Sequence, residues 1–204
     1  MSSLRAGEEG FTLIELLLVV AISAVIVFPM GAALMGILHN SDATTRRMTQ
    51  SHDAQMATAF FPNDVQSSDV SPTVTSPDAR CDKGGNTPVI RFEWTDYTAG
   101  GFLGVYNLVV YSTEPGAAGV APLLRRRFCQ GATYGGLNAT PLNDTVVVRY
   151  LSSSIAPTVC GSSAGLTACG TAQPAESVVL SIVEQPVTQQ ATYAFQVSGV
   201  RRAQ

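Results

Sequence analysis

The chain has 204 residues, a formal net charge of −3 and an apolar fraction of 46%. This slightly acidic balance excludes a globally basic nucleic-acid-binding protein. Once a long apolar segment near the N-terminus and the ten residues before it are set apart, about 165 residues remain, which is the usual size of one globular domain. The composition therefore indicates a single domain carried on a membrane anchor.

The apolar segment carries one carboxylate almost at its start. From Phe11 to Leu38, Glu15 is the only formally charged side chain. A helix of this length measures about 42 Å, which is enough to span a hydrocarbon core of ~30 Å. A charged carboxylate costs about 2.5–3.5 kcal/mol at the bilayer centre and less near an interface, so Glu15 indicates a function and a partner. The alternative is a membrane anchor that tolerates Glu15 near the lipid headgroups.

The run Gly10-Phe11-Thr12-Leu13-Ile14-Glu15 resembles the prepilin signature of type IV pilins and type II secretion pseudopilins. The resemblance implies that residues 1–10 are a leader, that a prepilin peptidase cuts after Gly10, and that Phe11 becomes the N-methylated terminus. Glu15 would then direct assembly by meeting the terminal amine of an adjacent subunit. In apolar surroundings such a pair is attractive, whereas either charge alone is costly.

A secretory signal peptide is the competing interpretation of the N-terminus. Such a peptide has a basic start, an apolar core of about 7–15 residues and a cleavage site after that core. Here the apolar run is longer, and the leader carries Glu8 and Glu9 beside Arg5. Arg46 and Arg47 lie beyond the other end of the run, so the distribution of Lys and Arg does not set the membrane orientation. The expected extracytoplasmic position of the C-terminal part rests on the resemblance and on the cysteines.

The expected transmembrane and assembly helix, residues 11–38, contains a proline. Pro29 removes the amide that would bond to Val25, which predicts a kink. The kink would help subunits to pack, by analogy with pilins; the alternative is simple tolerance of proline in a membrane helix.

Residues 39–66 are expected to continue as an amphipathic helix. Its apolar side chains recur at spacings of three and four, which predicts one packed face formed by Met48, His52, Met56, Ala59 and Phe60. Pro62 predicts an end or a bend of the helix, with one further turn as an alternative.

Residues 67–204 are expected to form a β-rich head. A Ser-, Thr- and Pro-rich loop precedes a series of β-type segments, and residues 156–175 read as a second long loop. The expected strands are 89–94, 105–111, 123–129, 145–151, 177–184 and 192–200. No helical pattern lies between them, so a mainly antiparallel sheet follows. Together with the resemblance, this predicts an α+β, pilin-like fold: a long N-terminal helix packed on an antiparallel head.

All four cysteines fall within this head: Cys81, Cys129, Cys160 and Cys169. An even number fits two disulfides in an oxidising compartment, and the absence of a C-x-x-C pair argues against zinc. Four cysteines allow three pairings. We expect Cys160–Cys169 to close a local loop and Cys81–Cys129 to join distant segments.

The head shows no pattern of an enzyme. No histidine follows His52, so a Ser-His-Asp arrangement cannot be built there, and no phosphate-binding loop follows a strand. We expect no catalytic residue, cofactor or metal. In a strand, Arg125 and Arg127 share one face and Arg126 takes the other. They are expected to line a solvated edge or a row of intersubunit salt bridges; the alternative is that Arg125 and Arg127 contact DNA phosphates.

The order of leader, long helix and strands resembles minor pilins and minor pseudopilins, because the head is larger than that of a usual major subunit. The implied function is that of a structural minor subunit of a type IV pilus or a type II secretion pseudopilus. The alternative is a pilin-anchored module for DNA uptake or adhesion, and a membrane-tethered enzyme has the least support. The implied location is a single-pass inner-membrane protein with an extracytoplasmic head, and later the filament. The implied partners are the prepilin peptidase, other pilin or pseudopilin subunits, the inner-membrane assembly platform and, before assembly, membrane lipid.

Overall fold

A computed structural model describes residues 12–69, 81, 85–97, 104–117, 120–137, 140–152, 155, 157–161, 175–185 and 192–202. Within these residues lie one α-helix, seven strands and a short 3₁₀ turn at Tyr134–Gly136. The long elements are α1 (Leu13–Ser67), β1 (Thr87–Tyr97), β2 (Gly104–Glu114), β3 (Leu123–Gly131), β4 (Asn143–Val148), β5 (Pro157–Gly161), β6 (Ala175–Glu184) and β7 (Tyr193–Val200). The chain divides into two compact units, Met1–Arg47 and Met48–Gln204, and α1 contributes to both.

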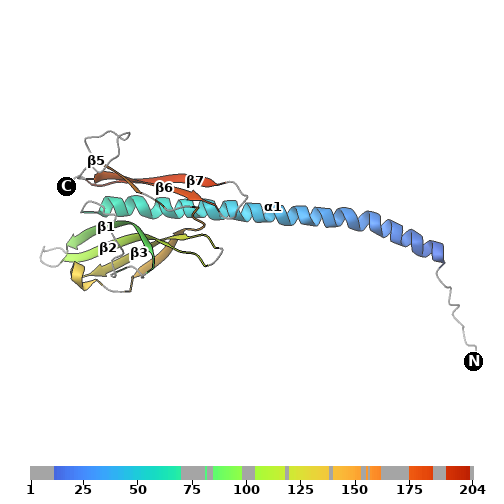
Figure 1. The fold of residues 1–204 in the computed structure, drawn as a ribbon, viewed down its shortest axis with the longest axis horizontal. Helices are drawn as coiled ribbons and strands as arrows, with labels where there is room; N and C mark the ends of the chain where they lie inside the picture. Colours follow the sequence, from blue (N-terminus) through green and yellow to red (C-terminus); the bar gives the residue numbers. More distant parts are fainter. Residues whose placement is uncertain are drawn as a thin grey trace, which may run out of the picture. The chain divides into compact units, whose positions relative to one another are not determined.

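The second unit is built from two antiparallel sheets and the C-terminal part of α1. One sheet has the strand order β1-β2-β3-β4 and the other has the order β5-β6-β7. Every paired strand is antiparallel to its neighbour in the chain, so no crossover is needed. This part of α1 lies between the two sheets (Figure 1). The expected α+β, pilin-like fold is confirmed.

The strands match the sequence prediction except at two places. Pro157–Gly161, expected as loop, forms the edge strand β5, which pairs with β6. Its terminal Pro and Gly are depleted in strands, so the segment has no β-type pattern of its own. β4 ends at Val148, before the predicted end at Leu151, because Tyr150 has a φ of 60° and leaves the extended conformation.

The main core forms where α1 meets both sheets. Phe61 lies edge-on against Phe92 and Tyr111, with ring centroids 5.7 and 5.6 Å apart. From the other side the three-stranded sheet contributes four buried side chains, Val178, Leu180, Ile182 and Val197. A helix between two sheets therefore buries opposite sides of its surface, which a single apolar stripe does not describe.

The predicted packed face of α1 was wrong. Met48 is 70% exposed, and His52 and Ala59 are exposed as well. The buried side chains of α1 are Asp53, Ala57, Phe61, Asp64 and Val65. Their spacings are also helical, but two of the five are carboxylates, so an apolar periodicity could not reveal them. Pro62 does not end α1, which continues to Ser67.

The Asp64 carboxylate can remain buried because three hydrogen-bond donors surround it. Its carboxylate accepts hydrogen bonds from Arg126 Nε at 2.7 Å, Arg126 Nη2 at 2.6 Å and the Tyr111 hydroxyl at 2.6 Å. Burial lowers the pKa of Arg126, but the hydrogen bonds and charges of Asp64 and Tyr111 together outweigh burial and leave the pKa above its usual value. Burial and the neighbouring Asp64 raise the pKa of Tyr111 well above its usual value, so the hydroxyl remains a donor. The guanidinium also lies 4.9 Å from the centroid of the Phe60 ring, a cation–π contact.

The C-terminal end of α1 is fixed by the end of β7. Arg201 donates from Nε to the Ser68 carbonyl at 3.2 Å and from Nη2 to the Asp69 carbonyl at 2.8 Å. A cation that binds carbonyls just beyond a helix complements the negative end of the helix dipole. Next to this cap, β7 approaches α1 so closely that a Cβ on Gly199 would lie 2.5 Å from Val65 Cβ.

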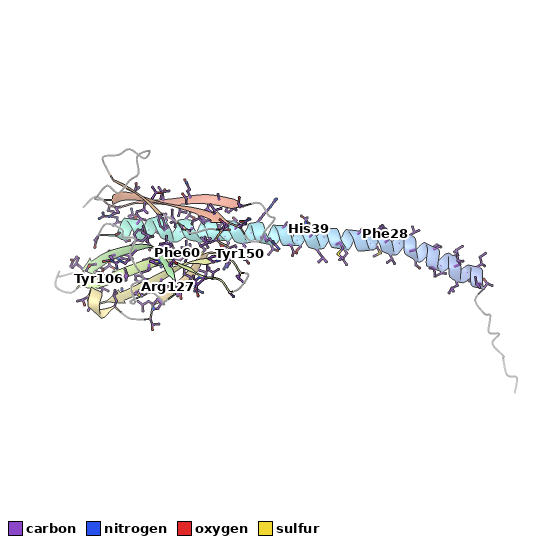
Figure 2. All side chains as sticks on the ribbon, viewed as in Figure 1. Phe28, His39, Phe60, Tyr106, Arg127 and Tyr150 are labelled. Carbon is purple, nitrogen blue, oxygen red and sulfur yellow. A yellow bond between two sulfur atoms is a disulfide. The ribbon has the colours of Figure 1, made fainter. Side chains whose placement is uncertain are left out.

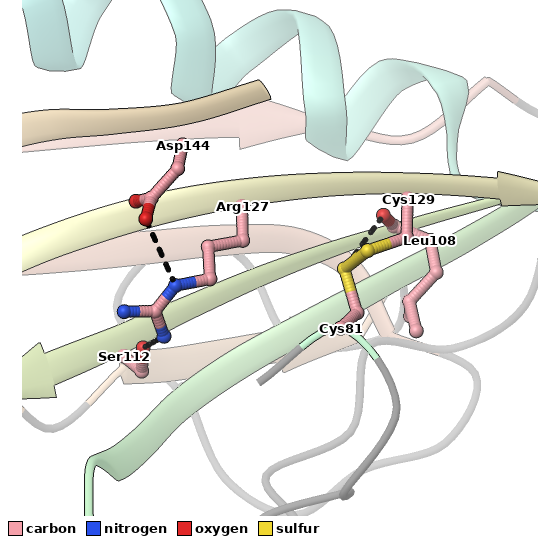
Figure 3. Close-up of a disulfide and its surroundings, with 6 residues drawn as sticks. All are labelled: Cys81, Leu108, Ser112, Arg127, Cys129 and Asp144. Carbon is pink, nitrogen blue, oxygen red and sulfur yellow. Dashed lines mark hydrogen bonds and ion pairs between the residues drawn. A yellow bond between two sulfur atoms is a disulfide. The ribbon is translucent and has the colours of Figure 1, made fainter. Parts of the chain in front are cut away.

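The expected Cys81–Cys129 disulfide is present on the other face of the four-stranded sheet (Figure 3). It joins residues 48 positions apart and packs with Leu108, Val110 and Leu137 in a second, smaller cluster. Cys169 lies outside the described residues, so the Cys160–Cys169 pairing stays a prediction.

We predict that Asp64→Asn strongly destabilises the head. The change leaves Arg126 buried without its charge partner, which typically costs about 3–5 kcal/mol. Urea unfolding of the full chain in detergent, followed by the fluorescence of the single tryptophan, Trp94, measures this loss. Asp42→Asn, at an exposed position of the same helix, is the control and should stay within about 0.5 kcal/mol of wild type. Equal stability of the two variants would show that the ion pair contributes nothing.

We also predict that Gly199→Ala destabilises the head by about 1–3 kcal/mol, because the new methyl overlaps Val65. Gly135→Ala is the matched control, since a Cβ there meets nothing within 4 Å. The double variant Gly199→Ala/Val65→Ala should show positive coupling, because removing Val65 methyl groups relieves the overlap. Additive losses in thermal unfolding would contradict the clash.

Candidate functional site

The described part of α1 begins with a polar pair at its first turn. The Glu15 amide donates to the Thr12 carbonyl at 3.0 Å and approaches Thr12 Oγ1 at 3.4 Å, and the Leu16 amide donates to the same carbonyl at 3.2 Å. Thr12 and Glu15 thus follow the T-x-x-E pattern of a capping box. The positive end of the helix dipole also stabilises a carboxylate in the first turn. Sequence reasoning missed Thr12, although its spacing to Glu15 was the signal.

From Leu16 to Leu38, α1 presents exposed apolar side chains. Among the described residues, α1 is the one helix long and apolar enough to cross a bilayer. Phe28 is 81% exposed and projects from this part of the helix (Figure 2). Apolar surface of this extent requires lipid or another protein surface to cover it.

Pro29 lies within this apolar part. The helix remains continuous through Pro29, and the expected kink stays a prediction. A shallow apolar hollow lies beside the proline. Its lining consists of Val27, Met30, Gly31, Ala33, Leu34 and Ile37. Gly31 has open space within 4 Å of where a Cβ would stand, so a small residue here lets another helix approach the backbone closely.

The expected cleavage and methylation positions, Gly10 and Phe11, lie outside the described residues. Their roles stay predictions.

The arginine cluster on β3 alternates as predicted. Arg126 faces α1, whereas Arg125 and Arg127 point to the opposite face of the sheet. The expected solvated edge was wrong, because β3 lies between β2 and β4.

Carboxylates of the same sheet surround Arg125 and Arg127. Arg125 pairs with Glu114 and, at 3.0 Å, with Asp144. The fully buried Arg127 side chain donates from Nη1 to Ser112 Oγ at 3.0 Å, and its Nε lies 3.6 Å from Asp144 Oδ2 (Figure 3). A DNA phosphate would have to displace these internal partners. Phosphate contact by Arg125 and Arg127 therefore stays a prediction that the geometry does not favour.

The described ranges contain no cluster of metal-binding side chains. No group of three or more His, Cys, Asp or Glu side chains in that part of the chain is placed to hold a metal ion.

Comparison with protein families gives one match. The model for the Prokaryotic N-terminal methylation motif matches residues 5–30, a range that includes Gly10, Phe11, Glu15 and Pro29. Comparison with curated proteins and with solved structures gives no match. The first turn of α1 and the apolar helix after it thus coincide with the matched range. The chain carries the N-terminal methylation motif that marks the type IV pilin and pseudopilin family.

Proposed function

We propose that this protein is a minor subunit of a type IV pilus or of a type II secretion pseudopilus. The observation that carries the proposal is the methylation motif at residues 5–30, which includes the start of an exposed apolar helix with a carboxylate in its first turn. The motif implies processing by a prepilin peptidase and assembly with pilin subunits into a filament. Before assembly, the apolar helix anchors such a protein in the inner membrane.

The proposed division of the chain follows from this role. Residues 1–10 are the leader, residues 11–38 the membrane and assembly helix, and residues 39–66 the amphipathic helix that continues into the head. Residues 67–204 complete an extracytoplasmic head. The size of the head supports a minor subunit, because the described residues alone form two sheets around the helix.

The proposed role of the head is structural. Pilin-family proteins are generally non-enzymatic, and here the buried charges of the four-stranded sheet pair with each other or with α1. The inner-membrane assembly platform is a further proposed partner. DNA binding and adhesion remain the alternative function, which salt-dependent binding of the full chain to DNA would reveal.

For Glu15 we propose pairing with the Phe11 amine of a neighbouring subunit. Glu15 is four residues, about one helical turn, from the proposed new terminus, so two neighbouring helices offset by about one turn along their axes would bring amine and acid together. In an apolar environment this pairing compensates both charges.

We predict that cleavage occurs after Gly10. Intact-mass analysis of the mature protein should show a chain that begins at methylated Phe11. Gly10→Val should abolish this product, because the larger side chain does not fit where glycine is expected at the cut. Gly7→Val, at the other glycine of the leader, is the control and should be processed normally. A mature chain that begins beyond Leu38 would instead identify a secretory signal peptide and overturn the proposal.

We predict that Glu15→Val leaves membrane insertion and leader cleavage intact but blocks incorporation into the filament. Glu15→Gln is the decisive companion, because glutamine preserves the capping-box position and removes only the charge. Both variants should lose co-purification with partner pilins at least tenfold if the charge pairs with an amine. Thr12→Ala keeps the charge, weakens the cap and should still assemble. If Glu15→Gln assembles like wild type, Glu15 acts only as a helix cap.

A further inference from the structure

The segment Arg149–Ser152, directly after β4, joins three parts of the head. The Ser152 amide donates to the Val183 carbonyl at 2.9 Å, and the Gln185 amide donates to the Tyr150 carbonyl at 2.8 Å. These bonds tie the segment to the end of β6. The Leu151 amide donates to the Pro122 carbonyl at 3.0 Å, which ties it to the start of β3.

The helix holds the same segment through Asp53. Asp53 accepts hydrogen bonds from the Arg149 amide at 2.7 Å and from Arg149 Nη1 at 2.8 Å. The next residue, Tyr150, has a φ of 60°, which non-glycine residues rarely adopt. Such a conformation persists only where the surrounding contacts hold it. We call this junction of α1, Arg149–Ser152 and the end of β6 the sheet joint.

Glu184 is the unexplained group in the sheet joint. Its side chain is fully buried opposite Leu151, and neither carboxylate oxygen has a hydrogen-bond partner among the residues that the structure describes. Asp53, which is also fully buried, already occupies the amide and Nη1 of Arg149. Two buried carboxylates therefore share one arginine, and ionising both would leave a negative charge without compensation.

The electrostatics agree with this geometry. Burial, and then the charge of Asp53, raise the pKa of Glu184 to about 8, although Arg149 acts in the opposite direction. Burial also raises the pKa of Asp53, against its hydrogen bonds and attraction to Arg149. The titratable and charged groups around the joint are His52 and Asp53 on α1, Arg149 and Tyr150 after β4, and Tyr193, the partner of Glu184 on β7.

We propose that Glu184 is a proton-controlled latch: it is protonated in the folded head at neutral pH, and loss of its proton releases the β5–β7 sheet from the sheet joint. The neutral acid is tolerated in the apolar interior, whereas the anion would repel Asp53 and compete for Arg149. Release would free Tyr150 from its constrained conformation. In the extracytoplasmic location proposed above, the latch would respond to the pH outside the cell, but the inference does not depend on that location.

The direction of the pH effect follows from proton linkage. Glu184 has a pKa of about 8 in the folded head against an ordinary pKa of 4.5 for a free side chain, so the closed joint binds the proton more tightly than the open one. The latch therefore contributes its full stability below about pH 4.5 and loses it progressively as the pH rises through about 8. Opening should increase by roughly a few hundredfold between pH 5 and pH 8 and level off above about pH 9.

Hydrogen exchange of the full chain in detergent tests the latch. After correction for intrinsic rates, amide exchange in β6, β7 and Arg149–Ser152 should rise by roughly a few hundredfold between pH 5 and pH 8. Amide exchange in β2 should not show this rise. Glu184→Gln mimics the protonated acid and should give a flat profile. Glu114→Gln removes a partly exposed carboxylate from the four-stranded sheet and should keep the wild-type rise.

Two results would overturn the proposal: a flat wild-type profile, or the same rise in Glu184→Gln as in wild type. If the glutamine variant does not fold, the carboxyl ¹³C signals of the wild-type protein decide instead. A glutamate carboxyl that titrates near pH 8 in the folded protein supports the latch. Titration of every glutamate below about pH 6 contradicts it.

Discussion

The placement of α1 in the head depends on two aspartates that cannot remain buried alone. Asp53 and Asp64 lie on one side of the helix because eleven residues make about three turns. Each finds its arginine on the four-stranded sheet or just after it, Arg149 and Arg126 respectively. An ion pair contributes little over an apolar contact, but a broken buried pair is strongly destabilising. The pairs thus select the one rotation and register of α1 that satisfies both.

The three-stranded sheet is attached by different means. It reaches α1 through the close approach of Gly199 to Val65, through the Arg201 cap and through the sheet joint at Glu184. Its attachment consequently relies on close packing, on the Arg201 hydrogen bonds and on a carboxyl group that has to be neutral, which makes it the more sensitive of the two contacts to pH.

The features predicted correctly from the sequence are those that local residue patterns determine. Six strands were found because half-buried strands alternate, and the Cys81–Cys129 pairing was confirmed. β5 was missed because its pairing with β6 comes from tertiary context. The buried face of α1 was wrong for the same reason: a carboxylate reads as solvent-facing until its arginine is located far along the chain. The methylation motif was readable because it consists of residues that are neighbours in the sequence, whereas Glu184 is defined by residues more than thirty positions away.

Four carboxylates of this chain lie in apolar surroundings, and each needs a group that neutralises its charge. The source of that group indicates whether the carboxylate holds the fold or serves a function. Asp53 and Asp64 are compensated by arginines of the same chain, so their role is to hold the fold. Glu184 has no such cation of its own, and a proton serves in its place, so its state follows the pH. For Glu15 the proposed cation is the amine of another subunit. Glu15 is thus the one carboxylate of the four whose proposed partner belongs to a second molecule. A charge in an apolar helix is costly, and assembly would supply the partner that compensates it. Glu15 is therefore the carboxylate whose loss should spare the fold and abolish assembly.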